Sequence, residues 1–146
     1  MGAPPTIPKN HAVMKTLILL LIPFLSEVES NNNPDAIGDH GQAVGVLQIH
    51  PVCVEDVNRI TGKHYTLEDR RDRSKSVEMC SAYLMHYGTA YELRTGQKAT
   101  PEVLARIWNG GPRGYSKAST LAYWVKVRRA MERGRAHHIA ALYLRE

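Results

Sequence analysis

The stretch ESNNNPDAIGDHGQAVGVLQ, residues 29–48, decides the fold, because it joins an apolar run to a segment rich in turn-forming residues. Upstream, residues 16–29 are apolar almost all round, which predicts a buried helix. Downstream, Pro34 and glycines at short intervals predict a loop with at most a small β-hairpin. Glu29 therefore stands where a buried helix meets a polar loop, at the lip of an expected cleft.

The remaining sequence predicts further helices with clear breaks between them. Prolines suit the first turns of two of these helices, and Ser74 and Thr100 are expected to cap the helices that follow them. The expected helices cover residues 51–61, 75–94, 101–108, 119–133 and 137–144. We expect a mainly α-helical single domain over residues 16–146, preceded by an irregular, proline-containing arm over residues 1–15.

The apolar run from Leu17 to Leu25 is open to three interpretations. After Lys15 it has the form of a short signal peptide, although no small-residue cleavage site follows it. As a membrane span it falls short of the roughly 20 apolar residues required. A buried core helix is the third possibility and the one we favour, so we expect no stable insertion into a membrane.

The charge distribution indicates a polyanionic partner. The chain carries a net charge of +5, and residues 101–146 hold nine Lys/Arg against three Asp/Glu. A basic C-terminal third suits nucleic acid, an anionic membrane or a cell-wall polymer. No nucleic-acid-binding motif accompanies it, so we expect no nucleic-acid partner. A solvated helix face would give the same pattern.

Neither the cysteines nor the histidines predict a metal site. Cys53 and Cys80 are too few for a disulfide framework and form no C-x-x-C motif, so they are either one bonded pair or two free thiols. The seven histidines lack the short spacing of zinc ligands. We therefore expect no metal site.

Glu29 has the setting of a general acid. Burial at the end of an apolar helix favours the protonated carboxyl and raises its pKa, as acid catalysis at neutral pH requires. Glu27, two residues earlier, cannot share a helical face with Glu29, so the two carboxylates need not have one role.

Four short motifs, in order, resemble those of the lytic transglycosylase family. Glu29-Ser30 with Asn33-Pro34 resembles the first motif, and GVLQ (45–48) resembles the second, with about one extra residue between them. ARIWNGGPRGY (105–115) resembles the third, with tryptophan and glycine in place of the usual tyrosine and alanine. LAYWVKV (121–127) resembles the closing tyrosine motif, and the resemblance spans about residues 17–130.

The resemblance implies a lysozyme-like, largely helical fold with a peptidoglycan groove. It implies cleavage of the β-1,4 bond between N-acetylmuramic acid and N-acetylglucosamine, without a cofactor. Glu29 then serves as acid and afterwards as base on the muramic 6-hydroxyl, which closes a 1,6-anhydro ring. The residues that the resemblance assigns to the substrate site, or to holding the acid there, are Ser30, Gln48, Asn109, Gly110 and Tyr123.

Two alternatives remain open from the sequence. A hydrolytic lysozyme of the same fold needs a second carboxylate to activate water, and Asp39 or Asp35 is the candidate. An inactive glycan-binding module is the other, although such a module does not need Glu29. We expect a monomer that acts on peptidoglycan glycan strands in the bacterial envelope, outside the cell, or in a phage lysis or entry system.

Overall fold

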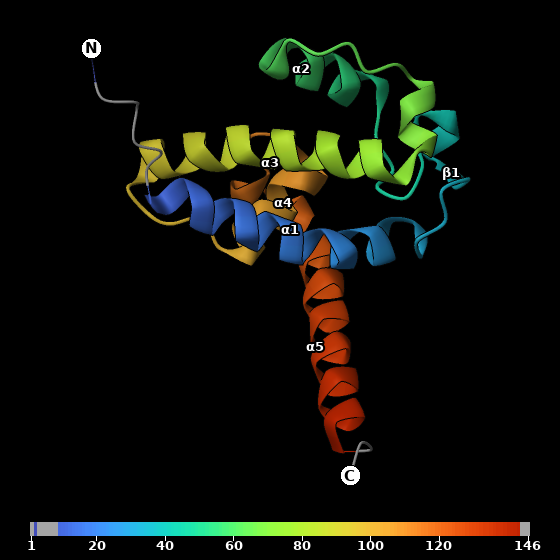
Figure 1. Ribbon diagram of the computed structural model, residues 1–146, viewed down its shortest axis with the longest axis vertical. Coiled ribbons are helices and arrows are strands. Elements are labelled where there is room, and N and C mark those ends of the chain that lie inside the picture. Colours follow the sequence, from blue (N-terminus) through green and yellow to red (C-terminus); the bar gives the residue numbers. More distant parts are fainter. Residues whose placement is uncertain (1, 3–8, 144–146) are drawn as a thin grey trace.

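The computed structural model describes residues 2 and 9–143, and this part of the chain is mainly helical (Figure 1). A short two-stranded sheet follows the first helix, as the sequence predicts. The α-helices and strands are α1 (Lys9–Ser30), β1 (Ile37–Gly38), β2 (Ala43–Val44), α2 (Pro51–Thr61), α3 (Arg73–Thr95), α4 (Pro101–Gly110) and α5 (Leu121–Tyr143).

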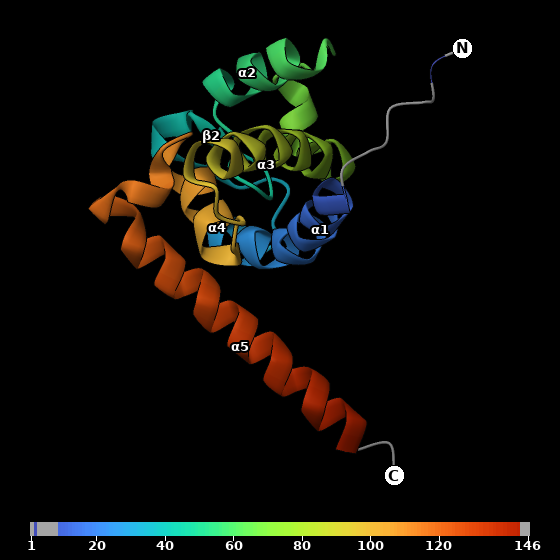
Figure 2. The ribbon, with the colours of Figure 1, turned by 90° about the vertical axis from the view of Figure 1, so that its left-hand side faces the viewer.

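Helix α3 lies between α2 on one side and α1 on the other (Figures 1 and 2). Helix α4 packs against α1, α3 and α5. The side chains that become fully buried between these layers are large and aliphatic, and their removal from water drives the packing. They include Ile18, Leu25, Leu47, Leu84, Leu104 and Ile107.

Helix α1 begins at Lys9, so the prediction of an irregular arm over residues 1–15 is wrong for residues 9–15. The buried face of the helix includes Met14, which lies within the predicted arm. Residues 3–8 lie outside the described part. Pro23 sits inside the helix on its exposed side, where water can satisfy the backbone carbonyl that proline leaves without a donor.

Residues His11–Ser30 of α1 are long and apolar enough to cross a membrane, judged by length and composition alone. A third of this window is buried inside the protein. A core helix of a soluble protein and a signal sequence have the same length and composition.

Two predicted helix boundaries are wrong. Helix α3 is capped by Asp72, whose side chain accepts a hydrogen bond of 2.9 Å from the Lys75 amide, rather than by Ser74. Helix α5 is continuous, where the sequence predicted a break between residues 133 and 137. Gly134 in this region packs against Phe24 of α1, since a Cβ there would lie 2.8 Å from the Phe24 ring. The end of α5 extends away from the other helices (Figure 2).

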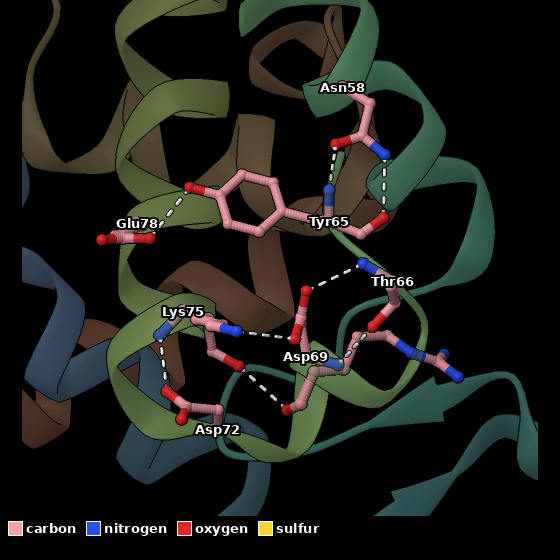
Figure 3. A network of polar contacts seen from close by, with 9 residues as sticks. Asn58, Tyr65, Thr66, Asp69, Asp72, Lys75 and Glu78 are labelled. Atoms are coloured by element: carbon pink, nitrogen blue, oxygen red, sulfur yellow. Dashed lines mark hydrogen bonds and ion pairs between the residues drawn. The ribbon is translucent and has the colours of Figure 1, made fainter. Parts of the chain in front are cut away.

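The segment between α2 and α3 is tied down by polar contacts (Figure 3). The Asn58 side chain donates to the Tyr65 carbonyl over 2.9 Å and accepts from the Tyr65 amide over 2.8 Å. The Tyr65 hydroxyl donates to Glu78 of α3, and Asp69 forms an ion pair of 3.0 Å with Lys75. These contacts fix α2 on α3 and so set the position of one wall of the cleft described next.

Candidate active site

A cleft of about 440 Å³ opens at the C-terminal end of α1. Its walls come from the end of α1 and from the hairpin segment (residues 37–49). The first turn of α2, the middle of α3 and the last turn of α4 complete them. The residues that line it include Glu29, Asp39, Gln48, Cys53, Tyr83 and Trp108. Polar groups in a concave site with apolar walls are the usual form of a ligand site.

Glu29 is the penultimate residue of α1 and is half-buried in this cleft. Burial raises the pKa of its carboxyl from 4.5 to about 7, although a hydrogen bond with the Trp108 side chain opposes the rise. Near neutral pH the carboxyl is therefore divided between the protonated and ionised forms. This division suits a group that first gives and then takes a proton.

Aromatic rings form the wall beside Glu29. Trp108 at the end of α4 is half-buried and meets Tyr83 of α3 edge to face, with 5.5 Å between the ring centroids. Both rings line the cleft. Trp108 thus packs against the hydrophobic core and lines the cleft at the same time.

The hairpin segment is held by a buried arginine. The guanidinium of Arg70 donates hydrogen bonds to the carbonyls of Gln42 (2.9 Å) and Ile49 (3.0 Å). Gly45 makes the approach possible, because its φ is +87° and a Cβ there would lie 1.9 Å from the Arg70 carbonyl oxygen. Steric exclusion of any side chain therefore explains why the GVLQ motif begins with glycine.

Gln48 lines the cleft and also braces the hairpin segment. Its side-chain Nε2 donates to the carbonyls of Ala36 (3.1 Å) and Gly45 (3.0 Å). Its Oε1 lies over Gly38, where a Cβ would approach it to 2.5 Å. Contact between Gln48 and the substrate remains a prediction, and its amide nitrogen already has two backbone partners.

Both Asp39 and Asp35 are exposed, but only Asp39 is among the residues that line the cleft. The Asp39 carboxylate lies 3.4 Å from Nε2 of His50, which also lines the cleft. Asp39 adopts a left-handed backbone conformation with φ of 48°, which aspartate tolerates better than most residues. Of the two candidates for water activation, the structure thus brings only Asp39 near Glu29.

Ser30 connects the end of α1 to the hairpin segment. Its hydroxyl donates to the Val46 carbonyl over 2.8 Å and accepts from the Asn33 amide over 3.1 Å. It also lies 3.3 Å from the Ser26 carbonyl. These backbone contacts give Ser30 a bracing role, and contact with substrate remains a prediction.

The three remaining predicted site residues, Asn109, Gly110 and Tyr123, lie in three different environments. Asn109 is exposed and lines the cleft. Gly110 faces Thr120, where a Cβ would come within 2.5 Å of the threonine methyl, and Gly111 rather than Gly110 lines the cleft. Tyr123 is buried and is not among the residues that line the cleft, and its hydroxyl has no hydrogen-bond partner among the described residues. Burial and the nearby Glu29 both raise the Tyr123 pKa.

Sequence reasoning missed Tyr83, His50 and Cys53 as cleft residues. The one sequence signal for Tyr83 is the helical spacing of the aromatic residues along α3. Both cysteines are free thiols, and burial raises the pKa of Cys53 to about 12, so this thiol is not a nucleophile at neutral pH. The described residues contain no group of three or more His, Cys, Asp or Glu arranged to hold a metal ion.

Comparison with known protein families finds a match. The family model of the transglycosylase SLT domain matches residues 8–124, from α1 to the start of α5. Among curated proteins, none matches the chain.

Proposed function

Because the chain belongs to the family of the transglycosylase SLT domain and has its lysozyme-like fold, we propose that it is a peptidoglycan lytic transglycosylase with Glu29 as its single acid and base. Enzymes of this family act on glycosidic bonds of peptidoglycan. The observation that carries the finer proposal is the pKa of Glu29, which burial raises to about 7 in a cleft large enough for sugar.

The proposed reaction uses the Glu29 carboxyl twice. The protonated carboxyl gives its proton to the oxygen that leaves with N-acetylglucosamine, as the bond to muramic C1 breaks. The carboxylate then removes the proton of the muramic 6-hydroxyl, whose oxygen bonds to C1. The net change is cleavage with a 1,6-anhydro ring, and the carboxyl returns to its starting form.

Surrounding groups support these two steps. Burial of Glu29 makes the acid form available at neutral pH. The hydrogen bond with the Trp108 side chain stabilises the ionised form once the proton has left. The Trp108 and Tyr83 rings offer apolar surface against which a sugar face can pack. The bracing of the hairpin segment by Arg70 and Ser30 keeps the opposite wall in place.

A hydrolytic lysozyme is the second candidate, and Asp39 is the observation that favours it. Its carboxylate lines the same cleft as Glu29 and lies 3.4 Å from Nε2 of His50, and a second carboxylate in the cleft is the group with which an inverting glycosidase activates water. Inverting glycosidases place such a base about 6.5–9.5 Å from the acid.

Mass spectrometry of the products of purified peptidoglycan separates the two candidates. Ring closure yields muropeptides with anhydro-muramyl ends, one water lighter than the hydrolysed products. We expect anhydro ends. Reducing muramic ends alone would replace the proposal with the lysozyme, and binding to sacculi without release would indicate an inactive glycan-binding module.

A further inference from the structure

A cavity of about 840 Å³, here called the α5 groove, lies where α5 leaves the other helices (Figure 2). Helix α1 and the start of α4 form one side of it, and α5 forms the other. Among the described residues, none lines both this groove and the Glu29 cleft. The groove is therefore an apolar surface that the fold leaves uncovered, separate from the candidate active site. The apolar residues that line it include Leu20, Phe24, Pro101, Trp124 and Met131.

Helix α5 continues well past the residues that hold it to the rest of the protein. Ala130 is its last fully buried residue among those whose burial is described, and the described side chains from Arg135 to Leu142 are exposed. Helices in proteins owe most of their stability to the packing of one face. The match to the family model ends at residue 124, so the projecting part is not part of the matched domain. This half of α5 is therefore available to pack on something other than the core of its own chain.

One face of α5 carries a row of side chains, here called the α5 stripe, at alternating spacings of four and three residues. This spacing keeps side chains on one side of a helix, as in the seam of a coiled coil. The stripe begins in the α5 groove and continues along the projecting end of the helix. Its members are Trp124, Arg128, Met131, Arg135, His138 and Leu142.

The α5 stripe is complementary to itself when two copies of α5 run antiparallel. A two-fold axis beside position 133 brings together residues whose numbers lie equally far on either side of 133, which is the arrangement of an isologous dimer. In this register no arginine of the stripe faces another arginine, and two apolar side chains meet at each end. Parallel pairing would instead place each arginine beside its own equivalent. The facing pairs of the antiparallel register are Trp124 with Leu142, Arg128 with His138, and Met131 with Arg135.

The charges of the groove also suit the end of a second α5. Residues 136–143, here called the distal segment, contain no Lys, Arg, Asp or Glu. The distal segment therefore brings no like charge against Arg128 and Arg135, which line the groove. The acidic residue that α5 contributes to the groove, Glu132, already forms an ion pair of 3.8 Å with Arg128 of its own helix.

The shape of the groove favours a helix over a lipid surface. Arginine beside tryptophan would also suit anionic lipid. However, α5 leaves α1 at a steep angle in both views, and the groove lies in the inner corner between them (Figures 1 and 2). A flat surface would touch the outer edges of this corner, whereas a helix can lie inside it.

We propose that the protein forms a dimer in which two α5 helices pair antiparallel along the α5 stripe, with each distal segment in the α5 groove of the other copy. This inference is independent of the proposed function, because the α5 groove and the Glu29 cleft have no lining residue in common. It departs from the monomer expected from the sequence, since the sequence did not predict that α5 is continuous and projects from the other helices.

Sedimentation velocity of the full chain over a wide range of concentrations measures the dimer and its dissociation constant. Leu142→Glu places a charge against Trp124 of the second copy and should weaken the dimer by about tenfold or more. His138→Glu, on the same face, places a carboxylate opposite Arg128 in both halves and should tighten the dimer about threefold. Both positions are exposed in the single chain, so neither change should unfold it, and circular dichroism checks that helix content is kept.

Leu93→Glu is the matched control, because Leu93 is an exposed leucine of α3 outside the α5 groove, and the dissociation constant should stay unchanged. A monomer at every concentration, or a dimer that Leu142→Glu leaves intact, would overturn the proposal. A dimer weakened by His138→Glu would overturn the antiparallel register. Binding of a purely monomeric wild type to phosphatidylglycerol vesicles would assign the α5 groove to lipid instead.

Discussion

The hydroxyl of Ser30, the residue directly after Glu29, donates a hydrogen bond of 2.8 Å to the carbonyl of Val46. This bond joins the end of the helix that carries the acid to the hairpin segment that forms the opposite wall of the cleft. The first two sequence motifs are thus in direct contact, since each motif supplies one partner of the bond.

Ser30→Ala should lower the free energy of unfolding by about 1–2 kcal/mol, because the Val46 carbonyl loses its donor in a partly buried position. Urea unfolding gives this value. Ser119→Ala is the control, because Ser119 is exposed and its replacement should change stability by less than about 0.5 kcal/mol. An equal change in the free energy of unfolding in the two variants would show that the Ser30 hydroxyl does not stabilise the hairpin segment.

Gly45→Ala should destabilise the protein by more than about 2 kcal/mol, because the new Cβ would meet the Arg70 carbonyl at 1.9 Å. Gly41 has a similar positive φ of +89° with open space around it, so Gly41→Ala isolates the backbone strain, which costs about 1 kcal/mol. Thermal unfolding compares the two. A Gly45→Ala protein as stable as Gly41→Ala would show that the hairpin segment yields and that Arg70 does not fix it.

Tyr123→Phe should leave the protein as stable as the wild type or more so, since it removes a buried hydroxyl without a partner among the described residues. We also expect kcat to fall about tenfold, if the hydroxyl positions Glu29 during the reaction as the family resemblance implies. Tyr91→Phe is the matched control, because the buried Tyr91 donates to Gln97, and it should lose about 1 kcal/mol with unchanged kcat. A stability loss in Tyr123→Phe with unchanged kcat would give Tyr123 a purely structural role.

The raised pKa of Glu29 links stability to pH. Below pH 4.5 the carboxyl is protonated in both the folded and unfolded chains. Between pH 4.5 and about 7 the folded state binds more protons, so its stability falls as pH rises, by about 3 kcal/mol in total. Glu29→Gln should therefore be more stable than the wild type above pH 7 and equal to it near pH 4, measured by urea unfolding. A stability difference independent of pH would contradict the raised pKa.

The sequence predicted the parts of the fold that local chemistry controls. The helix from Pro51 to Thr61 and the Thr100 cap follow from residues with strong positional preferences, and the structure confirms both. The first helix, predicted to end at Glu29, ends one residue later at Ser30, and the hairpin after it is confirmed.

What the sequence did not predict depends on packing between distant segments. The continuity of α5 past Gly134 involves contact with Phe24, a residue more than a hundred positions away. The cleft-lining roles of Tyr83 and His50 likewise require α3 and the hairpin segment to meet at Glu29. The backbone contacts of Ser30 and Gln48 also lie beyond what a motif shows, because a motif gives residue types without their partners.

The most direct test of the central claim is the muropeptide profile released by the wild type, Glu29→Gln and Glu27→Gln. Glu27 forms an ion pair of 2.9 Å with Arg133, so it is a matched carboxylate on the same helix. We predict anhydro-muramyl products from the wild type and from Glu27→Gln, and a rate lower by about 10²–10⁴ for Glu29→Gln, as expected for loss of a general acid. Full release of anhydro products by a folded Glu29→Gln protein would contradict the account.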